Sequence, residues 1–156
     1  EWLRARKPVN ALELACGTGL FTRHLAPMVE SLMAIDASPE VIAINRARLA
    51  QQGAANVTFA EADLFAWKPR VRYDLVFMSF WLSHVPMTRF DAFWSMLGDA
   101  LAPGGAIYLI DSAHDPTSTA VNHVLPATDI GVVTRKLGDG STYHIVKPFW
   151  TPPRLA

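Results

Sequence analysis

The sequence predicts an α/β protein built on a doubly wound parallel sheet. Short apolar runs alternate with segments that carry helix start and stop signals, which is typical of parallel strands joined by helices. The first apolar run ends in a glycine-spaced loop, and two later runs end on a carboxylate. With 156 residues and 51% hydrophobic content, the chain can bury one sizeable core, so we expect a single domain over residues 1–156.

The expected strands come from short apolar or alternating segments bounded by turn residues. They cover residues 9–15, 31–36, 56–64, 73–80 and 106–111. Beyond them, residues 132–146 form two strands that turn at Asp139-Gly140, a strong hairpin signal. The sequence therefore predicts five sheet strands followed by a C-terminal β-hairpin.

The expected helices are placed by their end signals. A first helix covers residues 19–29. Ser38, Pro39 and Glu40 are an N-cap, a first-turn proline and a first-turn acid, so a second helix begins there and runs to Gly53. Thr88, with Asp91 three residues later, is a capping box for a third helix through Leu101.

Charge and composition exclude several classes of partner. Lys and Arg number 14, as do Asp and Glu, so no overall field would attract nucleic acid or an anionic membrane surface. No apolar stretch reaches the roughly 20 residues that a bilayer crossing needs. The single cysteine forms no internal disulfide and agrees with a reducing compartment, so we expect a cytoplasmic protein.

The loop after the first strand predicts a ligand site, because ligands of doubly wound sheets bind at the carboxyl ends of the strands. Gly17 and Gly19 let the backbone approach a ligand closely. A dinucleotide-binding loop has the pattern G-x-G-x-x-G, but in this sequence Thr22 occupies the position of the third glycine. Glu13 lies just before the loop. Its carboxylate would repel phosphates and would favour a cationic ligand.

The stretch ELACGTG resembles the first motif of class I S-adenosylmethionine-dependent methyltransferases, with Ala15 in place of the first glycine. The stretches EADLF, YDLVFMSFWLSHV and LAPGGAIYLID resemble later motifs of that family and follow in its order over residues 9–111. The resemblance implies a three-layer Rossmann-like sheet of strand order 3-2-1-4-5 and S-adenosylmethionine as cofactor. It also implies transfer of a methyl group to an unidentified small molecule.

The resemblance further implies a set of cofactor-binding positions. Asp36 would take the two ribose hydroxyls, Asp63 and Leu64 would contact adenine, and the backbone near Met78 and Ser79 would line the methionine end. The full expected set is Glu13, Ala15, Cys16, Gly17, Gly19, Asp36, Ala37, Asp63, Leu64, Met78 and Ser79.

A purely structural role is the alternative for each of the three carboxylates in this set and for the cysteine. Asp36 could be only an acid at a helix N-terminus, and Glu13 could only fix backbone amides of the loop. Asp63 could equally cap a turn before Phe65. Cys16 is most simply a small residue that fits, and we assign it no redox role.

His84 is the best candidate for a catalytic base, because it follows the fourth strand at the edge of the expected site and histidine titrates near neutral pH. The alternative is a histidine that caps or packs the next helix, since methyl transfer can work by proximity alone. Asp111 is a weaker candidate. The remaining histidines show no metal-ligand spacing, so we predict no metal.

The family pattern has seven strands with helices ahead of the first, and neither end of this sequence leaves room for them, so we expect a chain shortened at both ends. The hairpin could cover the site as a lid or pair with a second copy in a homodimer. Two other functions stay open: an NAD(P)-binding oxidoreductase, and a module that binds S-adenosylmethionine without catalysis.

Overall fold

The computed structural model describes residues 2–112, 123–124, 132–136 and 138–155. The chain divides into two compact units. The first combines residues 1–79 with 91–109, and the second combines residues 80–90 with 110–156. The two units are described separately below, and the expectation of a single domain stays a prediction.

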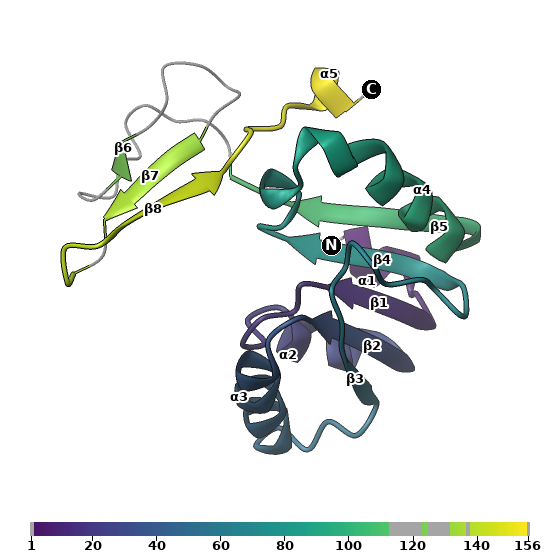
Figure 1. Cartoon of the computed structure of the whole chain (residues 1–156). Helices are drawn as coiled ribbons and strands as arrows, with labels where there is room; N and C mark the ends of the chain where they lie inside the picture. The colour runs from purple at the N-terminus through teal and green to yellow at the C-terminus, as the bar shows by residue number, and fades with distance from the viewer. Residues whose placement is uncertain (1, 113–122, 125–131, 137, 156) are drawn as a thin grey trace. The chain divides into compact units, whose positions relative to one another are not determined.

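The first unit contains a five-stranded sheet of order β3-β2-β1-β4-β5 (Figure 1). Its strands are β1 (Asn10–Leu14), β2 (Ser31–Asp36), β3 (Val57–Glu61), β4 (Tyr73–Ser79) and β5 (Leu101–Ile110). Strand β1 pairs in parallel with both β2 and β4, and β2 pairs in parallel with β3. The predicted strand order is confirmed.

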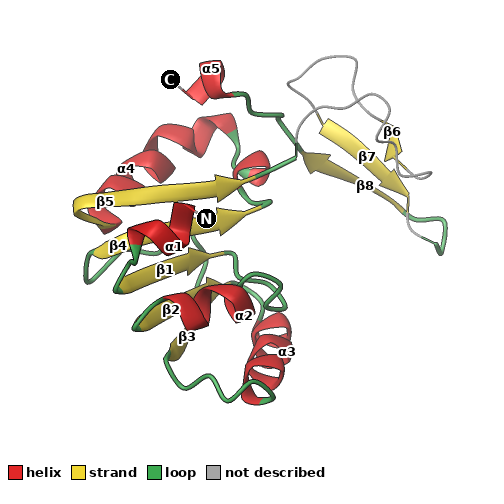
Figure 2. Cartoon of the chain, turned by 180° about the vertical axis from the view of Figure 1, so that it is seen from behind, coloured by secondary structure: helices red, strands yellow, loops and turns green. Residues whose placement is uncertain are grey.

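The central strands form the core of this unit. Leu12 and Leu14 of β1, Ile35 of β2 and Leu75 and Val76 of β4 are fully buried. Near-continuous apolar strands are expected where helices cover both faces of a parallel sheet. Figures 1 and 2 show α4 (Phe90–Ala100) on the face opposite α1 (Trp2–Arg6) and α2 (Thr22–Leu25), which gives the predicted three layers.

Helix α3 (Pro39–Ala50) begins where the sequence placed it. The Ser38 hydroxyl accepts a hydrogen bond from the amide of Val41, as an N-cap should. After the helix, Gly53 takes a positive φ of 68°, the backbone conformation that ends many helices.

The first helix is shorter than predicted. The sequence placed it over residues 19–29, whereas α2 starts at Thr22 and a 3-10 turn, η1 (Ala26–Met28), replaces its second half. Two features explain the difference. Gly19 has a φ of 87°, which lies outside the helical region, and Pro27 has no amide hydrogen to continue an α-helix.

The third helix also departs from its prediction. A 3-10 turn, η3 (Met87–Arg89), precedes α4 and contains Thr88, so the expected capping box does not begin the helix. Leu101 belongs to β5, which starts before the expected position 106. Pro86, in an extended conformation, ends the previous segment and starts this helical stretch two residues earlier than Thr88 could.

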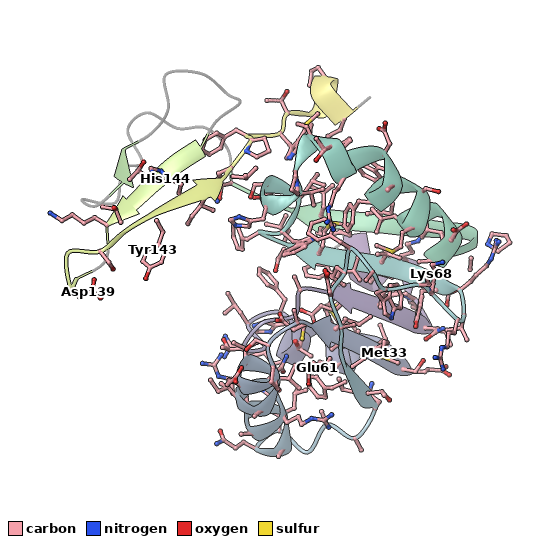
Figure 3. The ribbon with its side chains drawn as sticks, in the orientation of Figure 1. Met33, Glu61, Lys68, Asp139, Tyr143 and His144 are labelled. Atoms are coloured by element: carbon pink, nitrogen blue, oxygen red, sulfur yellow. The ribbon has the colours of Figure 1, made fainter. Side chains whose placement is uncertain are left out.

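The second unit contains a three-stranded antiparallel sheet of order β6-β7-β8. Its strands are β6 (His123–Val124), β7 (Val132–Lys136) and β8 (Thr142–Val146). The predicted hairpin is confirmed: Gly140 has a φ of 89°, and Asp139 accepts hydrogen bonds from the amide and hydroxyl of Ser141. Figure 3 shows Tyr143 and His144 projecting from β8.

The remaining elements of the second unit are short. They are the 3-10 turn η2 (Leu82–His84) and the helix α5 (Pro152–Leu155). Among the residues that the structure describes, no helix combines the length and the apolar character needed to cross a membrane.

Candidate cofactor-binding site

The candidate site lies where the carboxyl ends of three neighbouring strands are aligned. Leu14, the last residue of β1, pairs with Ile35 of β2 and with Met78 of β4. The loop that follows β1, the carboxylate that ends β2 and Ser79 at the end of β4 therefore lie along one edge of the sheet. The register thus brings together positions that are far apart in the sequence.

The loop of residues 15–19, here called the glycine loop, owes its shape to left-handed backbone torsions. Ala15, Gly17 and Gly19 have φ values of 53°, 52° and 87°. Ala15 therefore adopts the conformation that the expected glycine would take, at a steric cost of about 1 kcal/mol. The amide of Gly19 donates to the carbonyl of Cys16 over 3.2 Å and closes the turn.

Gly17 and Gly19 differ in their surroundings. A Cβ added to Gly17 would meet nothing within 4 Å, whereas one added to Gly19 would lie 2.2 Å from Oδ1 of Asn45. Only Gly19 is therefore required both by its torsion and by close approach. The glycine loop is pressed directly onto helix α3 at this residue.

Asp36 links β2 to the glycine loop. Its Oδ2 accepts a hydrogen bond from the amide of Gly17 over 2.8 Å, and its Oδ1 accepts one from the amide of Ser38 over 3.1 Å. An ionised carboxylate has about four acceptor positions, so these two bonds leave capacity for sugar hydroxyls. Asp36 thus holds the start of α3 and the loop together; Ala37 beside it is exposed.

Glu13 is buried beneath the loop, with 1% of its surface exposed. Burial raises the pKa of Glu13 to about 7, a hydrogen bond from the Thr22 hydroxyl opposes this, and the nearby charge of Asp36 adds to it. Oε2 of Glu13 has no hydrogen-bond partner among the described residues. The carboxylate bonds to a side chain of α2 rather than to the loop amides that the plainer interpretation required.

Cys16 is buried within the glycine loop. Burial raises the pKa of its thiol to about 12, and the charges of Glu13 and Asp36 raise it further in the same direction. The thiol is therefore protonated at neutral pH, and a protonated thiol is a poor nucleophile. This agrees with the expectation that Cys16 has no redox role.

The residues expected to contact adenine follow β3. Oδ1 of Asp63 accepts from the amide of Phe65 over 2.9 Å, and the Asp63 carbonyl accepts from the amides of Ala66 and Trp67. Asp63 therefore caps a turn, as its plainer role required, and its side chain is exposed. Leu64 is buried.

The residues after β4 belong to the second unit, where Asp111 and Trp150 hold them by hydrogen bonds. Asp111 accepts from the amide and the hydroxyl of Ser83, each over 2.8 Å, and from the amide of Ser112 over 2.7 Å. The indole Nε1 of Trp150 donates to the carbonyl of Leu82. These contacts fix η2, which ends at the half-exposed His84. Asp111 thus holds this turn, and its role as the weaker candidate for the base stays a prediction.

Three residues of the site were missed by the sequence analysis: Thr22, Asn45 and Arg48. One signal could have revealed Asn45, because it lies at helical spacing between Ile42 and Leu49, and all three are buried. A polar residue within a buried helical stripe needs a polar partner. No such signal exists for Arg48, which lies on the exposed surface of α3.

No group of three histidine, cysteine or acidic side chains that could hold a metal is present in the described part of the chain. His114 lies outside the described residues. The expectation of a metal-free site stays a prediction.

Comparison with known proteins gives the family. The family model described as a methyltransferase domain matches residues 11–105. Nodulation protein S from Rhizobium tropici is 33% identical over 138 residues, which are 85% of this chain and 56% of that protein. The chain thus spans about half the length of this curated relative. A stretch of 66 residues is 33% identical to the 23S rRNA (uracil(1939)-C(5))-methyltransferase RlmD of Shewanella sp. (strain ANA-3), and covers 42% of this chain and 15% of that protein.

A solved structure agrees with this family assignment. The complex of DhpI with S-adenosylhomocysteine (SAH) superposes with a TM-score of 0.78 and 39% sequence identity, covering 99% of this chain and 67% of that chain. The fold prediction is confirmed, and the bound SAH supports the cofactor prediction. The chain belongs to the methyltransferase domain family.

Proposed function

We propose that the protein transfers a methyl group from S-adenosylmethionine (SAM) to a small-molecule acceptor. The observation that carries the proposal is the junction of the glycine loop with Asp36. One oxygen of this carboxylate holds the Gly17 amide, and the carboxylate keeps acceptor capacity at the aligned strand ends. A charge-assisted bond from a ribose hydroxyl to such a carboxylate contributes roughly 1.5–3 kcal/mol.

The cofactor would be held by the expected set of residues. Asp36 takes the ribose hydroxyls, and Gly17 and Gly19 allow close approach of the backbone. Asp63 and Leu64 contact adenine, and the backbone at Met78 and Ser79 lines the methionine end. Glu13, buried next to the loop with an unpartnered oxygen, favours a ligand that carries positive charge.

The reaction is a displacement at carbon. A lone pair of the acceptor forms a bond to the methyl carbon, the carbon–sulfur bond breaks, and its electron pair stays on sulfur. Holding the two reactants in line can contribute about 7–11 kcal/mol. Where the acceptor carries a proton at neutral pH, His84 is the proposed base, because η2 is fixed from two sides by Asp111 and Trp150.

A dinucleotide is a poorer fit to this loop. The third glycine of the G-x-G-x-x-G pattern would stand at Thr22, but that side chain is fully buried. Its hydroxyl also bonds to both Glu13 and Asn45. The carboxylate of Asp36, which accepts the Gly17 amide, would in addition repel a diphosphate.

The balance of basic and acidic residues in the chain supports one class of methyl acceptor. Equal numbers of basic and acidic residues provide no field for a polyanion, which favours a small molecule over RNA. The RNA-modifying relative matches less than half of this chain, so it carries less weight. We place the protein in the cytoplasm, where Cys16 stays reduced. Pairing of two copies through the β7–β8 hairpin is the proposed route to any homodimer.

Thermal unfolding with SAM, SAH and NAD in parallel tests the cofactor. A ligand at 100 times its dissociation constant adds about 2.7 kcal/mol of stability, so SAM and SAH should each raise the melting temperature and NAD should not. Stabilisation by NAD alone contradicts the proposal.

Transfer of a labelled methyl group from SAM, with panels of amines, carboxylic acids, phenols and RNA, then tests catalysis. Label in one of the small-molecule panels is the expected result. Label in RNA alone would overturn the acceptor class. Binding of SAM without transfer to any panel would favour a module that binds the cofactor without catalysis.

A further inference from the structure

Two polar side chains of helix α3 reach across to the glycine loop. Asn45 and Arg48 lie three residues apart, which places them on the same side of the helix. Nδ2 of Asn45 donates to the carbonyl of Gly17 over 3.3 Å and to the Thr22 hydroxyl over 2.8 Å. Nη1 of Arg48 donates to the carbonyl and the hydroxyl of Thr18, over 2.8 and 3.0 Å.

The peptide groups of the loop are thereby held from both sides. The amide of Gly17 donates to Asp36 while its carbonyl accepts from Asn45, and the next carbonyl accepts from Arg48. Both groups that fix the carbonyls come from α3, which begins at Pro39, three residues after Asp36. One helix and the strand end before it therefore set the orientation of three successive peptide planes, 16–17, 17–18 and 18–19.

A glycine-rich loop needs contacts from outside the loop to hold it in one conformation. Glycine loses more backbone freedom on ordering than any other residue, and ordering one residue costs about 1–2 kcal/mol. A loop that is already ordered when its ligand arrives avoids that cost at the binding step, which tightens binding. Hydrogen bonds to backbone carbonyls are well suited to this task because they do not depend on the loop side chains.

Packing alone does not account for the two residues. Asn45 is fully buried, although burying an amide carries a desolvation cost, and its Oδ1 has no hydrogen-bond partner among the described residues. Arg48 is exposed and fills no core space. What the two side chains share is the glycine loop.

We propose that Asn45 and Arg48, here called the α3 clamp, are positioning residues that hold the glycine loop in its cofactor-binding shape and so set the affinity for SAM. The clamp acts through the loop and does not touch the cofactor. This inference rests on the proposed function, because the loop must be the cofactor site for the clamp to matter.

Titration calorimetry with SAH, on the wild-type chain and on Arg48→Ala, gives the first test. Removing both bonds to Thr18 should weaken SAH binding about fivefold to tenfold. Arg46→Ala is the matched control, since Arg46 lies two residues away on the same helix and stacks over Phe59 instead of the loop. Its dissociation constant should stay within twofold of wild type, and Arg48→Lys should recover part of the lost affinity.

Asn45→Ala tests the buried half of the clamp and should weaken SAH binding at least tenfold. Thr22→Val is the companion variant: it keeps the side-chain volume and removes the hydroxyl that bonds to both Asn45 and Glu13, but it leaves the bond from Asn45 to the Gly17 carbonyl, so it should weaken binding less. If Asn45→Ala does not fold, the Arg48 series decides the outcome alone.

A residue that positions the glycine loop and a residue that only stabilises the fold should affect different measurements. All titrations are run well below the unfolding midpoint of each variant, so a residue that only stabilises the fold would lower that midpoint and leave the dissociation constant unchanged. Unchanged SAH affinity in both Arg48→Ala and every folded Asn45 variant would overturn the clamp. Absence of SAH binding to the wild-type chain would instead overturn the proposed function, and the role of the clamp with it.

Discussion

The two compact units use the same device at the end of a strand, but with different consequences. In the first, Asp36 at the end of β2 accepts the amide of Gly17. In the second, Asp111, directly after β5, accepts the amide of Ser83. Among the residues that the structure describes, Asp36 accepts hydrogen bonds from two groups, whereas Asp111 accepts from three, one of them the buried hydroxyl of Ser83.

A carboxylate at a strand end is therefore not by itself evidence of a ligand site. Both residues look alike in the sequence, and both hold a loop that follows another strand. What distinguishes them is the acceptor capacity that remains after the loop has been fixed. Asp36 combines loop support with free capacity, and Asp111 gives its capacity to the turn that carries His84.

The largest expected effect separates the two glycines of the glycine loop. Gly19→Ala places a Cβ 2.2 Å from Oδ1 of Asn45 at a φ of 87°. Overlap and torsional strain together should lower the free energy of unfolding by about 3 kcal/mol. Gly17→Ala, which has open space, should lose only about 1 kcal/mol. Urea unfolding of both variants checks this, and equal losses would show that α3 does not confine the loop.

Glu13→Gln should change how stability depends on pH. In the wild type the folded pKa of Glu13, about 7, lies above its ordinary value of 4.5. The folded state therefore holds the proton more tightly, and this stabilising contribution is complete below pH 4.5 and is lost as the pH rises to about 7. The loss corresponds to about 3 kcal/mol at most.

The measurement is urea unfolding of wild type and Glu13→Gln from pH 4 to 8. The stability of the variant relative to wild type should increase between pH 4.5 and 7 and then level off. A constant difference over that range would mean that Glu13 is not a buried group with a raised pKa.

The paired variants Asp36→Asn and Asp111→Asn test the comparison itself. Asp36→Asn should weaken SAM binding at least tenfold, because a sugar hydroxyl loses its charged acceptor. Asp111→Asn should instead lower the free energy of unfolding by roughly 2 kcal/mol, because the amide group cannot accept from both the amide and the hydroxyl of Ser83. Urea unfolding should show a loss of stability in both variants, because an amide at position 36 likewise cannot keep the bonds from both Gly17 and Ser38, whereas calorimetry should show a large loss of SAM affinity in Asp36→Asn alone. The same pattern in both would remove the distinction.

The smallest expected effect concerns Ala15. Its φ of 53° is a conformation in which glycine is not strained. Ala15→Gly should therefore raise the free energy of unfolding by up to about 1 kcal/mol, reduced by the greater freedom of glycine in the unfolded chain. A clear loss of stability on denaturant unfolding would show that the alanine methyl group contributes to packing.

The sequence allowed much of the first unit to be predicted, because local signals there agree with the tertiary structure. Ser38 and Pro39 start α3 where expected, and β2 has the predicted bounds. The shortening of the first helix was harder to foresee, since the turn that ends at Gly19 depends on contact with Asn45 of another element. The part played by Asn45 and Arg48 depends on the same contact between α3 and the loop.

The plainer role of Asp63 was anticipated as an alternative, and the turn cap that it required is formed. The commitment of Asp111 was not anticipated. Its three partners lie at Ser83, far away in the sequence, and at Ser112 beside it, and no sequence pattern indicates that the two serines share one carboxylate. Sequence signals thus locate strand ends well, but they do not show how much of a carboxylate remains for a ligand.

A crystal structure of the protein with SAH would show whether Asp36 and the glycine loop hold the cofactor. We expect the ribose hydroxyls within hydrogen-bonding distance of the Asp36 carboxylate, which still accepts the amide of Gly17, and the cofactor along residues 15–19. A ribose bound away from Asp36, or a glycine loop that preferentially binds the diphosphate of NAD in a parallel soak, would contradict this expectation.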